Sequence, residues 1–114
     1  NICLRRNLRD GNTSVAYHST DTPACIYSYV EKIAKLLEPF GPCNFQLRTD
    51  KEGIPKLFEI NARFSGTTPI RALFGLNEVE YVISYLINRK ESSFDLRYGK
   101  VIRYMEEKYI PGDK

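Results

Sequence analysis

Three side chains in the middle of the sequence carry oxygen atoms that are suited to binding a metal ion. Gln46 lies in the alternating run 43–49, and Glu59 and Asn61 lie two positions apart in the run 54–61. A short polar loop with a glycine joins the runs, which predicts a β-hairpin. In such a hairpin all three side chains project from one face near a shared end. One carboxylate and two amide carbonyls suit Mg²⁺, which takes further oxygens from phosphate and water.

Groups that attract phosphate follow the predicted hairpin directly. Arg63 carries a permanently charged guanidinium group, whose paired N–H donors match the geometry of phosphate oxygens. Residues 65–68 (S-G-T-T) form a small polar loop that leads into a helix predicted to begin at Thr68, where backbone N–H groups favour anions. Metal ligands, an arginine and this loop, all within about twenty residues, predict a site for a nucleotide triphosphate.

The same residue types have a simpler interpretation. A glutamate and an asparagine two apart on a strand are common on a solvated face, and a single arginine is common in a surface ion pair. Two amides and a carboxylate beside a Gly-Thr-Thr loop are less usual on such a face. The sequence leaves both interpretations open at this point.

The remaining periodicity predicts the elements that must position these groups. Amphipathic spacing predicts a helix over 23–37 with Thr22 as its N-cap and Pro23 at its first position. After the S-G-T-T loop, a short helix with Ile70, Leu73 and Phe74 on one side ends at Gly75. The other predicted elements are a strand over 2–6, a turn at 9–13, a strand over 13–19, a helix capped by Asn77 with its apolar residues between Val79 and Ile87, and a strand-like stretch over 101–105. The fold class is therefore α+β, with a mostly antiparallel sheet and helices on one face.

Length and composition limit the class of protein. The 114 residues form one domain, 42% of them are apolar, and the formal net charge is only +3. No apolar run is long enough to cross a membrane or to act as a signal peptide. Because the sequence begins at Asn1, we expect it to be a piece of a longer protein. The cysteines Cys3, Cys25 and Cys43 form no C-x-x-C pair and are expected to be reduced, buried thiols of a cytoplasmic protein.

Two segments together resemble a known family. Residues 41–46 (G-P-C-N-F-Q) and 59–68 (E-I-N-A-R-F-S-G-T-T) resemble the C-terminal half of an ATP-grasp domain, of the type found in the carbamoyl-phosphate synthase large subunit and related carboxylate–amine ligases. The preceding helix and the L-F-G-L-N segment at 73–77 also fall where this family has them. The resemblance spans roughly residues 1 to 90, and the whole chain, 1–114, is expected to be one such subdomain with a terminal strand and tail over 98–114.

The resemblance implies a role for each matching residue. Gln46 and Glu59 would bind one Mg²⁺, with Mn²⁺ as a substitute. Glu59, as a bridging ligand, and Asn61 would bind a second ion, and Arg63 would hold the γ-phosphate of ATP or the acyl-phosphate made from it. A small carboxylate or bicarbonate would be activated and joined to an amine, which makes the intact protein a C–N ligase.

The chain departs from the family pattern in two respects. Ala62 stands where the family usually has proline, which should loosen the aim of Arg63 slightly. The family also uses an N-terminal lobe with lysines for the α- and β-phosphates and a hinge for the adenine. Nothing in the sequence supplies that lobe, so this chain would hold half of an active site and would be inactive by itself.

Several other residues have weaker cases for a function. Thr67, Thr68 and Arg71 are candidate substrate contacts, and Arg71 is equally well explained as a solvated helix residue. The roles of Arg5, Arg6 and Arg9 are left open between contacts to phosphate or carboxylate and an edge strand that resists self-pairing. His18 is better explained as a structural residue than as a catalytic one, and Arg103 and Tyr104 are interpreted as structural.

Two other functions compete with the ligase. A basic α+β module could bind single-stranded nucleic acid through its arginine-rich first strand and its tyrosines. Against it, the carboxylate of Glu59 would repel phosphate unless a metal ion intervened. A non-catalytic ATP-grasp lobe is the other alternative, although such a lobe has no physical need for a complete set of metal ligands.

Overall fold

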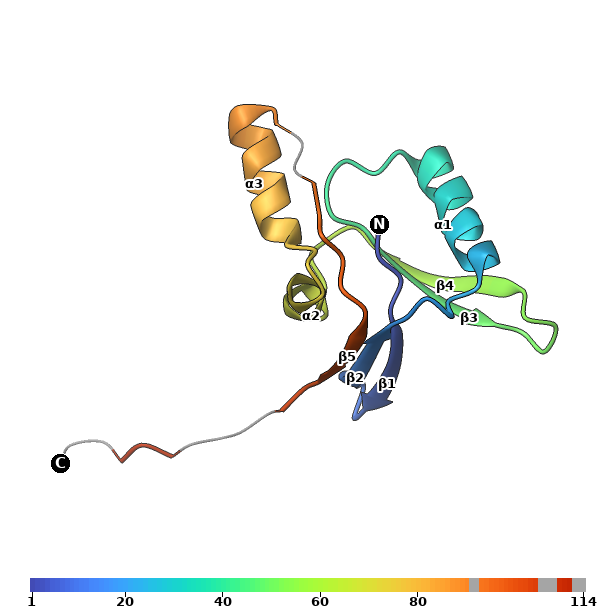
Figure 1. Cartoon of the computed structure of the whole chain (residues 1–114), viewed down its shortest axis with the longest axis horizontal. Coiled ribbons are helices and arrows are strands. Elements are labelled where there is room, and N and C mark those ends of the chain that lie inside the picture. Colours follow the sequence, from blue (N-terminus) through green and yellow to red (C-terminus); the bar gives the residue numbers. More distant parts are fainter. Residues whose placement is uncertain (91–92, 105–108, 112–114) are drawn as a thin grey trace.

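The computed structural model describes residues 1–90, 93–104 and 109–111. All strand pairs in it are antiparallel, as the predicted α+β class requires, but they form two separate sheets rather than one. One sheet has three strands in the order β1-β2-β5, and the other is the β3–β4 hairpin (Figure 1). The elements in chain order are β1 (Arg5–Arg9), β2 (Asn12–His18), α1 (Ala24–Leu37), β3 (Asn44–Thr49), β4 (Pro55–Asn61), α2 (Thr68–Leu73), α3 (Glu78–Asn88) and β5 (Gly99–Ile102).

The three-stranded sheet is built around β2. The turn before it has positive φ at both Asp10 (51°) and Gly11 (76°), which is the conformation that two-residue hairpins favour. The predicted first strand at 2–6 is therefore misplaced, because pairing with β2 begins only at Arg5, opposite Tyr17. On its other edge β2 pairs with β5, so residues from both ends of the sequence lie on neighbouring strands.

Helix α1 packs against β4 on one side of the hairpin (Figure 1). Its N-cap is Pro23, one residue later than predicted, and no side chain caps it. The helix ends where Glu38 adopts the left-handed conformation and donates its N–H to the Ala34 carbonyl at 2.9 Å. A direct bond fixes α1 on the hairpin, since the backbone N–H of Leu57 donates to the hydroxyl oxygen of Tyr29 at 3.2 Å.

The two later helices differ in how well they are covered. Ile70 and Phe74 of the α2 segment are buried as predicted, but Leu73 is 62% exposed, because the described elements cover only one side of this short helix. Asn77 caps α3 as predicted, its side chain accepting from the N–H of Glu80 at 3.3 Å. No residue of α3 is buried, however. Tyr81 packs against Phe94, but Val79, Ile83, Leu86 and Ile87 are exposed.

The buried core lies where β2 meets α2. Ala16 packs with Ile70 and Phe74, and the half-buried side chains of Ile2, Leu4 and Val101 surround them. His18 is buried beside this core. Its Nδ1 lies 2.8 Å from the carbonyl oxygen of Arg97, and its ring packs against those of Phe74 and Tyr98. These contacts place His18 among structural groups. Within the described residues, none of the helices has the length and apolarity that a membrane span needs.

Candidate functional site

A polar pocket of about 210 Å³ lies between the two sheets and the loop that precedes α2. Its lining residues are almost all polar or charged and come from both sheets and from that loop. They are Arg6, Gly11, Asn12, Thr13, Asn44, Gln46, Asn61, Arg63, Ser65, Gly66, Thr67 and Arg103. The volume is below the roughly 300 Å³ at which pockets for drug-sized ligands begin. The pocket thus has room for a phosphate or a small acid rather than a whole nucleotide.

The β3–β4 hairpin supplies the oxygen-bearing side of the pocket. Gln46 lies directly opposite Glu59, and Asn44 lies opposite Asn61, so these four side chains share one face of the hairpin. A bulge follows between Gln46 and Leu47, which limits this regular pairing to the end of the hairpin nearest the pocket. The predicted clustering of Gln46, Glu59 and Asn61 on one face is therefore present in the structure, with Asn44 as a fourth member that sequence reasoning missed.

Hydrogen bonds connect these side chains to Arg63. The amide nitrogen of Asn61 donates to Glu59 Oε1 at 2.7 Å, and its carbonyl oxygen accepts from Arg63 at 3.3 Å. The guanidinium of Arg63 also donates to the carbonyl oxygen of Phe64 at 3.0 Å. Glu59 itself is exposed and does not line the pocket, but it holds the amide of Asn61, which does. The order Glu59, Asn61, Arg63 is thus a chain of contacts that leads from the strand into the pocket.

The donor set suits a divalent cation only together with an anionic ligand. Gln46, Glu59 and Asn61 offer hard oxygens with a single negative charge. Gln46 Oε1 accepts a hydrogen bond from Arg6, and Asn61 Oδ1 accepts one from Arg63. Among the residues that the structure describes, no cluster of three His, Cys, Asp or Glu side chains exists. These side chains fit an ion that takes most of its ligands from phosphate and water, and not an ion held by protein alone.

Two arginines from outside the hairpin also line this pocket: Arg6, whose role the sequence left open, and Arg103, interpreted as structural. Arg6 projects from β1 and donates to Thr13 Oγ1 at 3.2 Å and to Gln46 Oε1. Arg103, directly after β5, makes a structural contact by donating to the carbonyl oxygen of Gly66, and it also lines the pocket. The order of strands in the sheet, which pattern alone does not give, brings Arg103 here.

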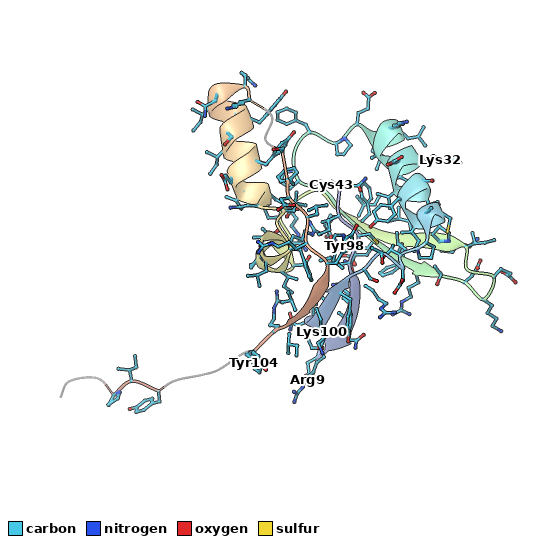
Figure 2. The ribbon with its side chains drawn as sticks, in the orientation of Figure 1. Arg9, Lys32, Cys43, Tyr98, Lys100 and Tyr104 are labelled. Atoms are coloured by element: carbon cyan, nitrogen blue, oxygen red, sulfur yellow. The ribbon has the colours of Figure 1, made fainter. Side chains whose placement is uncertain are left out.

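The neighbouring arginines and Tyr104 lie elsewhere. The guanidinium of Arg5 lies 5.0 Å from the ring centre of Tyr17. Arg9 is paired with Asp10 at 3.9 Å at the outer end of the sheet, and Tyr104 is strongly exposed (Figure 2). Of the three N-terminal arginines, only Arg6 therefore reaches the pocket.

Some residues of the S-G-T-T loop and α2 line the pocket, and others hold the surrounding elements in place. Thr67 is buried, lines the pocket and lies 2.7 Å, hydroxyl to hydroxyl, from Ser65. Thr68 and Arg71 do not line it, because Thr68 donates to Glu78 Oε2 at 2.7 Å and Arg71 is ion-paired with Glu78. Helix α2 has only six residues, so its dipole gives little reason to expect an anion site at its start.

Arg71 is not a solvated helix residue but forms a brace, by which we mean its contacts with Glu78 and Asn44. Its side chain is only 11% exposed, and besides the ion pair with Glu78 it donates to Asn44 Oδ1. Its Nε is buried without a partner among the described residues. The brace therefore connects α2, α3 and the β3 end of the hairpin, and it holds the side chain of Asn44 from behind the pocket.

The three cysteines differ in burial. All three are free; Cys3 and Cys43 are half-buried, and burial raises the pKa of each of these two thiols above its ordinary value. Cys25 is exposed, contrary to the expectation that all three are buried, because it lies on the outer side of the first turn of α1.

Comparison with known families gives a match over most of the chain. The profile of a family described as "ATP-grasp in the biosynthetic pathway with Ter operon" matches residues 2–108. No curated protein and no solved structure matches the sequence.

Proposed function

The chain belongs to the ATP-grasp family that matches residues 2–108, and from this premise we propose that it serves the activation of a carboxylate by ATP. Membership of the family indicates a ligase-type function with ATP as a substrate. The finer proposal is a carboxylate–amine ligase similar to the carbamoyl-phosphate synthase large subunit, acting on a small carboxylate or on bicarbonate. The observation that carries it is the placement of Gln46, Asn61 and Arg63 around one polar pocket.

The proposed reaction has two steps. A carboxylate oxygen attacks the γ-phosphorus of ATP, the bond between that phosphorus and the β–γ bridging oxygen breaks, and ADP leaves with the electron pair. An amine then attacks the carbonyl carbon of the acyl-phosphate, phosphate leaves, and the amine nitrogen loses a proton. In this proposal Arg63 binds the γ-phosphoryl oxygens and stays with them in the acyl-phosphate. In support, its guanidinium contacts only neutral acceptors among the described residues.

The oxygen-bearing side chains have a separate role in this proposal. Glu59, with Gln46 and Asn61, would hold one or two Mg²⁺ ions, which supply positive charge to the phosphate oxygens when bound. Thr67 is a further candidate contact for phosphate, because it is buried and lines the pocket. Thr68 and Arg71 are better assigned to the support of the site, given their bonds to Glu78.

The size of the pocket implies a partner surface. At about 210 Å³ it has room for the phosphate end of ATP but not for the adenosine. We therefore propose that a second lobe, of the same or another chain, covers the nucleotide and supplies contacts to the adenine and to the α- and β-phosphates.

Trapping with hydroxylamine tests this function even while the natural amine is unidentified. The full-length protein is incubated with ATP, Mg²⁺, hydroxylamine and a panel of small carboxylic acids. We expect one or a few acids to give a hydroxamate together with ADP and phosphate in equal amounts, because hydroxylamine attacks acyl-phosphates. If AMP and pyrophosphate form instead, the acyl-phosphate is excluded; if no acid raises ADP release, the ligase proposal fails.

A further inference from the structure

Three arginines line the pocket, and among the residues that the structure describes none of them is paired with a carboxylate. Arg6 donates to Thr13 and Gln46, Arg63 to Phe64 and Asn61, and Arg103 to Gly66, all of them neutral acceptors. The ion pairs in the described part of the chain involve other side chains. Because guanidinium groups stay charged at every physiological pH, this pocket has a strong excess of positive charge.

The three arginines come from two different parts of the fold that meet at the pocket. Arg63 follows β4 of the hairpin, which also provides the oxygens of Gln46 and Asn61. Arg6 and Arg103 come from the three-stranded sheet, where Asn12 and Thr13 also line the pocket. The lining residues from this sheet offer hydrogen-bond donors and a hydroxyl group but no carboxylate.

We propose that Arg6 and Arg103 bind the carboxylate of the acid substrate, while Arg63 binds the phosphoryl group. This rests on the proposed function, in which two negatively charged groups must approach to bonding distance. Their mutual repulsion is overcome only if each has its own countercharge. Arg63 serves the phosphoryl group, and Arg6 and Arg103 serve the acid, whose planar carboxylate matches the guanidinium fork.

Both guanidinium groups are held in place before any ligand binds. Arg6 bridges Thr13 of its own sheet and Gln46 of the hairpin, and Thr13 is itself buried. Arg103 is tied to Gly66 in the loop that precedes α2, and its backbone N–H donates to the Ser14 carbonyl at 2.8 Å. Side chains fixed in this way lose little freedom on binding, which favours recognition of a small anion.

The test follows the Nε–H resonances of the arginines by NMR in the isotope-labelled full-length protein. The probes are sodium acetate, as the simplest carboxylate, and inorganic phosphate, each at constant ionic strength with chloride as the balancing anion. We expect acetate to shift the resonances of Arg6 and Arg103 first and phosphate to shift that of Arg63 first. Arg6→Gln or Arg103→Gln should weaken acetate binding about 10- to 100-fold, since each removes a charge-assisted contact.

Matched variants separate recognition from folding. Arg5→Gln, next to Arg6 on β1 but stacked on Tyr17, should leave acetate binding unchanged. Arg6→Lys and Arg103→Lys keep the charge and lose the fork, so they should weaken acetate less than the glutamine variants do. If the glutamine variants fail to fold, acetate binding by the lysine variants still tests the proposal. The proposal is overturned if acetate binds equally well to all of them, or if both anions shift only Arg63.

Failure of the inference and failure of the proposed function give different results. Acetate shifts at Arg6 and Arg103 without hydroxamate from any acid would sustain the anion site and reject the ligase. A hydroxamate whose acid has the same KM in Arg6→Lys and Arg103→Lys as in the unchanged protein would sustain the ligase and reject the role of these arginines. A raised KM for the acid with an unchanged KM for ATP would support both.

Discussion

The two ends of the β3–β4 hairpin use similar residue types for different purposes. At the end nearest the pocket, Glu59 is hydrogen-bonded to Asn61 and faces Gln46, in a regular part of the ladder. At the far end, Asp50 accepts from the N–H groups of its own turn, at 2.8 Å from Ile54 and 3.1 Å from Glu52. The carboxylate of Asp50 at the far end stabilises a turn. The carboxylate of Glu59 at the near end lies beside Gln46 and Asn61, whose oxygen atoms can bind a ligand. The comparison therefore predicts that changes near the pocket alter activity and that changes at the far end alter only stability.

The largest expected effect is that of Glu59→Gln. It removes the only carboxylate of the proposed metal-binding set, so ATP-dependent hydroxamate formation in the full-length protein should fall about 1000-fold or more, equivalent to about 4 kcal/mol. The free energy of unfolding should hardly change, because Glu59 is exposed. The matched control is Glu52→Gln in the far turn, which should keep full activity. Unchanged turnover in Glu59→Gln would reject the metal assignment.

The next largest effect concerns the brace behind the pocket. Arg71→Met leaves the carboxylate of Glu78 half-buried without its cation and frees Asn44, and loss of one partner of a buried pair costs about 3–5 kcal/mol. Chemical denaturation should report this loss, and activity at low temperature should fall as well because Asn44 lines the pocket. Arg9→Met, at the exposed pair with Asp10, serves as the control. Equal stability of the two variants would show that the brace does not contribute to the free energy of unfolding.

A smaller effect is expected at the far turn of the hairpin. Gly53 has φ +81°, and an added Cβ there meets open space, so Gly53→Ala introduces backbone strain without a clash. Strain of this kind costs about 1–2 kcal/mol. Thermal or chemical unfolding should show that loss, while the KM for ATP and the turnover at low temperature stay unchanged. A loss of turnover as large as that of Glu59→Gln would contradict the division between the two ends.

The smallest effect is a pH dependence at the same turn. The hydrogen bond from the Ile54 N–H is the largest influence on the pKa of Asp50 and lowers it. Desolvation, the next largest, raises the pKa, but Lys56 and the N–H of Glu52 lower it further, so that it stays below its ordinary value. Because the folded pKa is the lower one, this contribution to stability is present above the unfolded pKa of about 3.9 and is lost as pH falls through the folded value. In Asp50→Asn the midpoint of unfolding should depend less on pH across that acidic range than it does in the unchanged protein. An unaltered slope would remove Asp50 from the account, and Asp10→Asn is the control.

The hairpin and the shared face of its polar side chains could be predicted from the sequence because both depend on local rules. Two alternating runs around a glycine-containing loop fix which of Gln46, Glu59 and Asn61 share a face, and no distant contact is needed to decide it. Asn44 was within reach of the same reasoning, since it is two residues from Gln46 on the same face. The pocket contribution of Arg103 was not, because it depends on β5 pairing with β2 across most of the chain.

The helices show a second limit of prediction from sequence, which is that their packing partners cannot be inferred. Apolar spacing identified α3 and its cap correctly, but periodicity reports only that one side is apolar, and not whether anything covers it. In the described structure the apolar residues of that side are mostly exposed, as is Leu73. The brace of Arg71 with Glu78 was missed for a related reason. The two residues belong to different helices, and the angle between those helices is set by tertiary packing.

In the proposed reaction the pocket promotes attack of a carboxylate on the γ-phosphate of ATP, and the fate of an ¹⁸O label shows whether this attack occurs. The acid that gives a hydroxamate is labelled with ¹⁸O in its carboxylate, and the full-length protein is allowed to turn over with ATP and an amine. We expect one ¹⁸O atom in each inorganic phosphate released, because the attacking oxygen remains on phosphorus. Phosphate without the label, formed at the same rate as product, would contradict the proposed reaction.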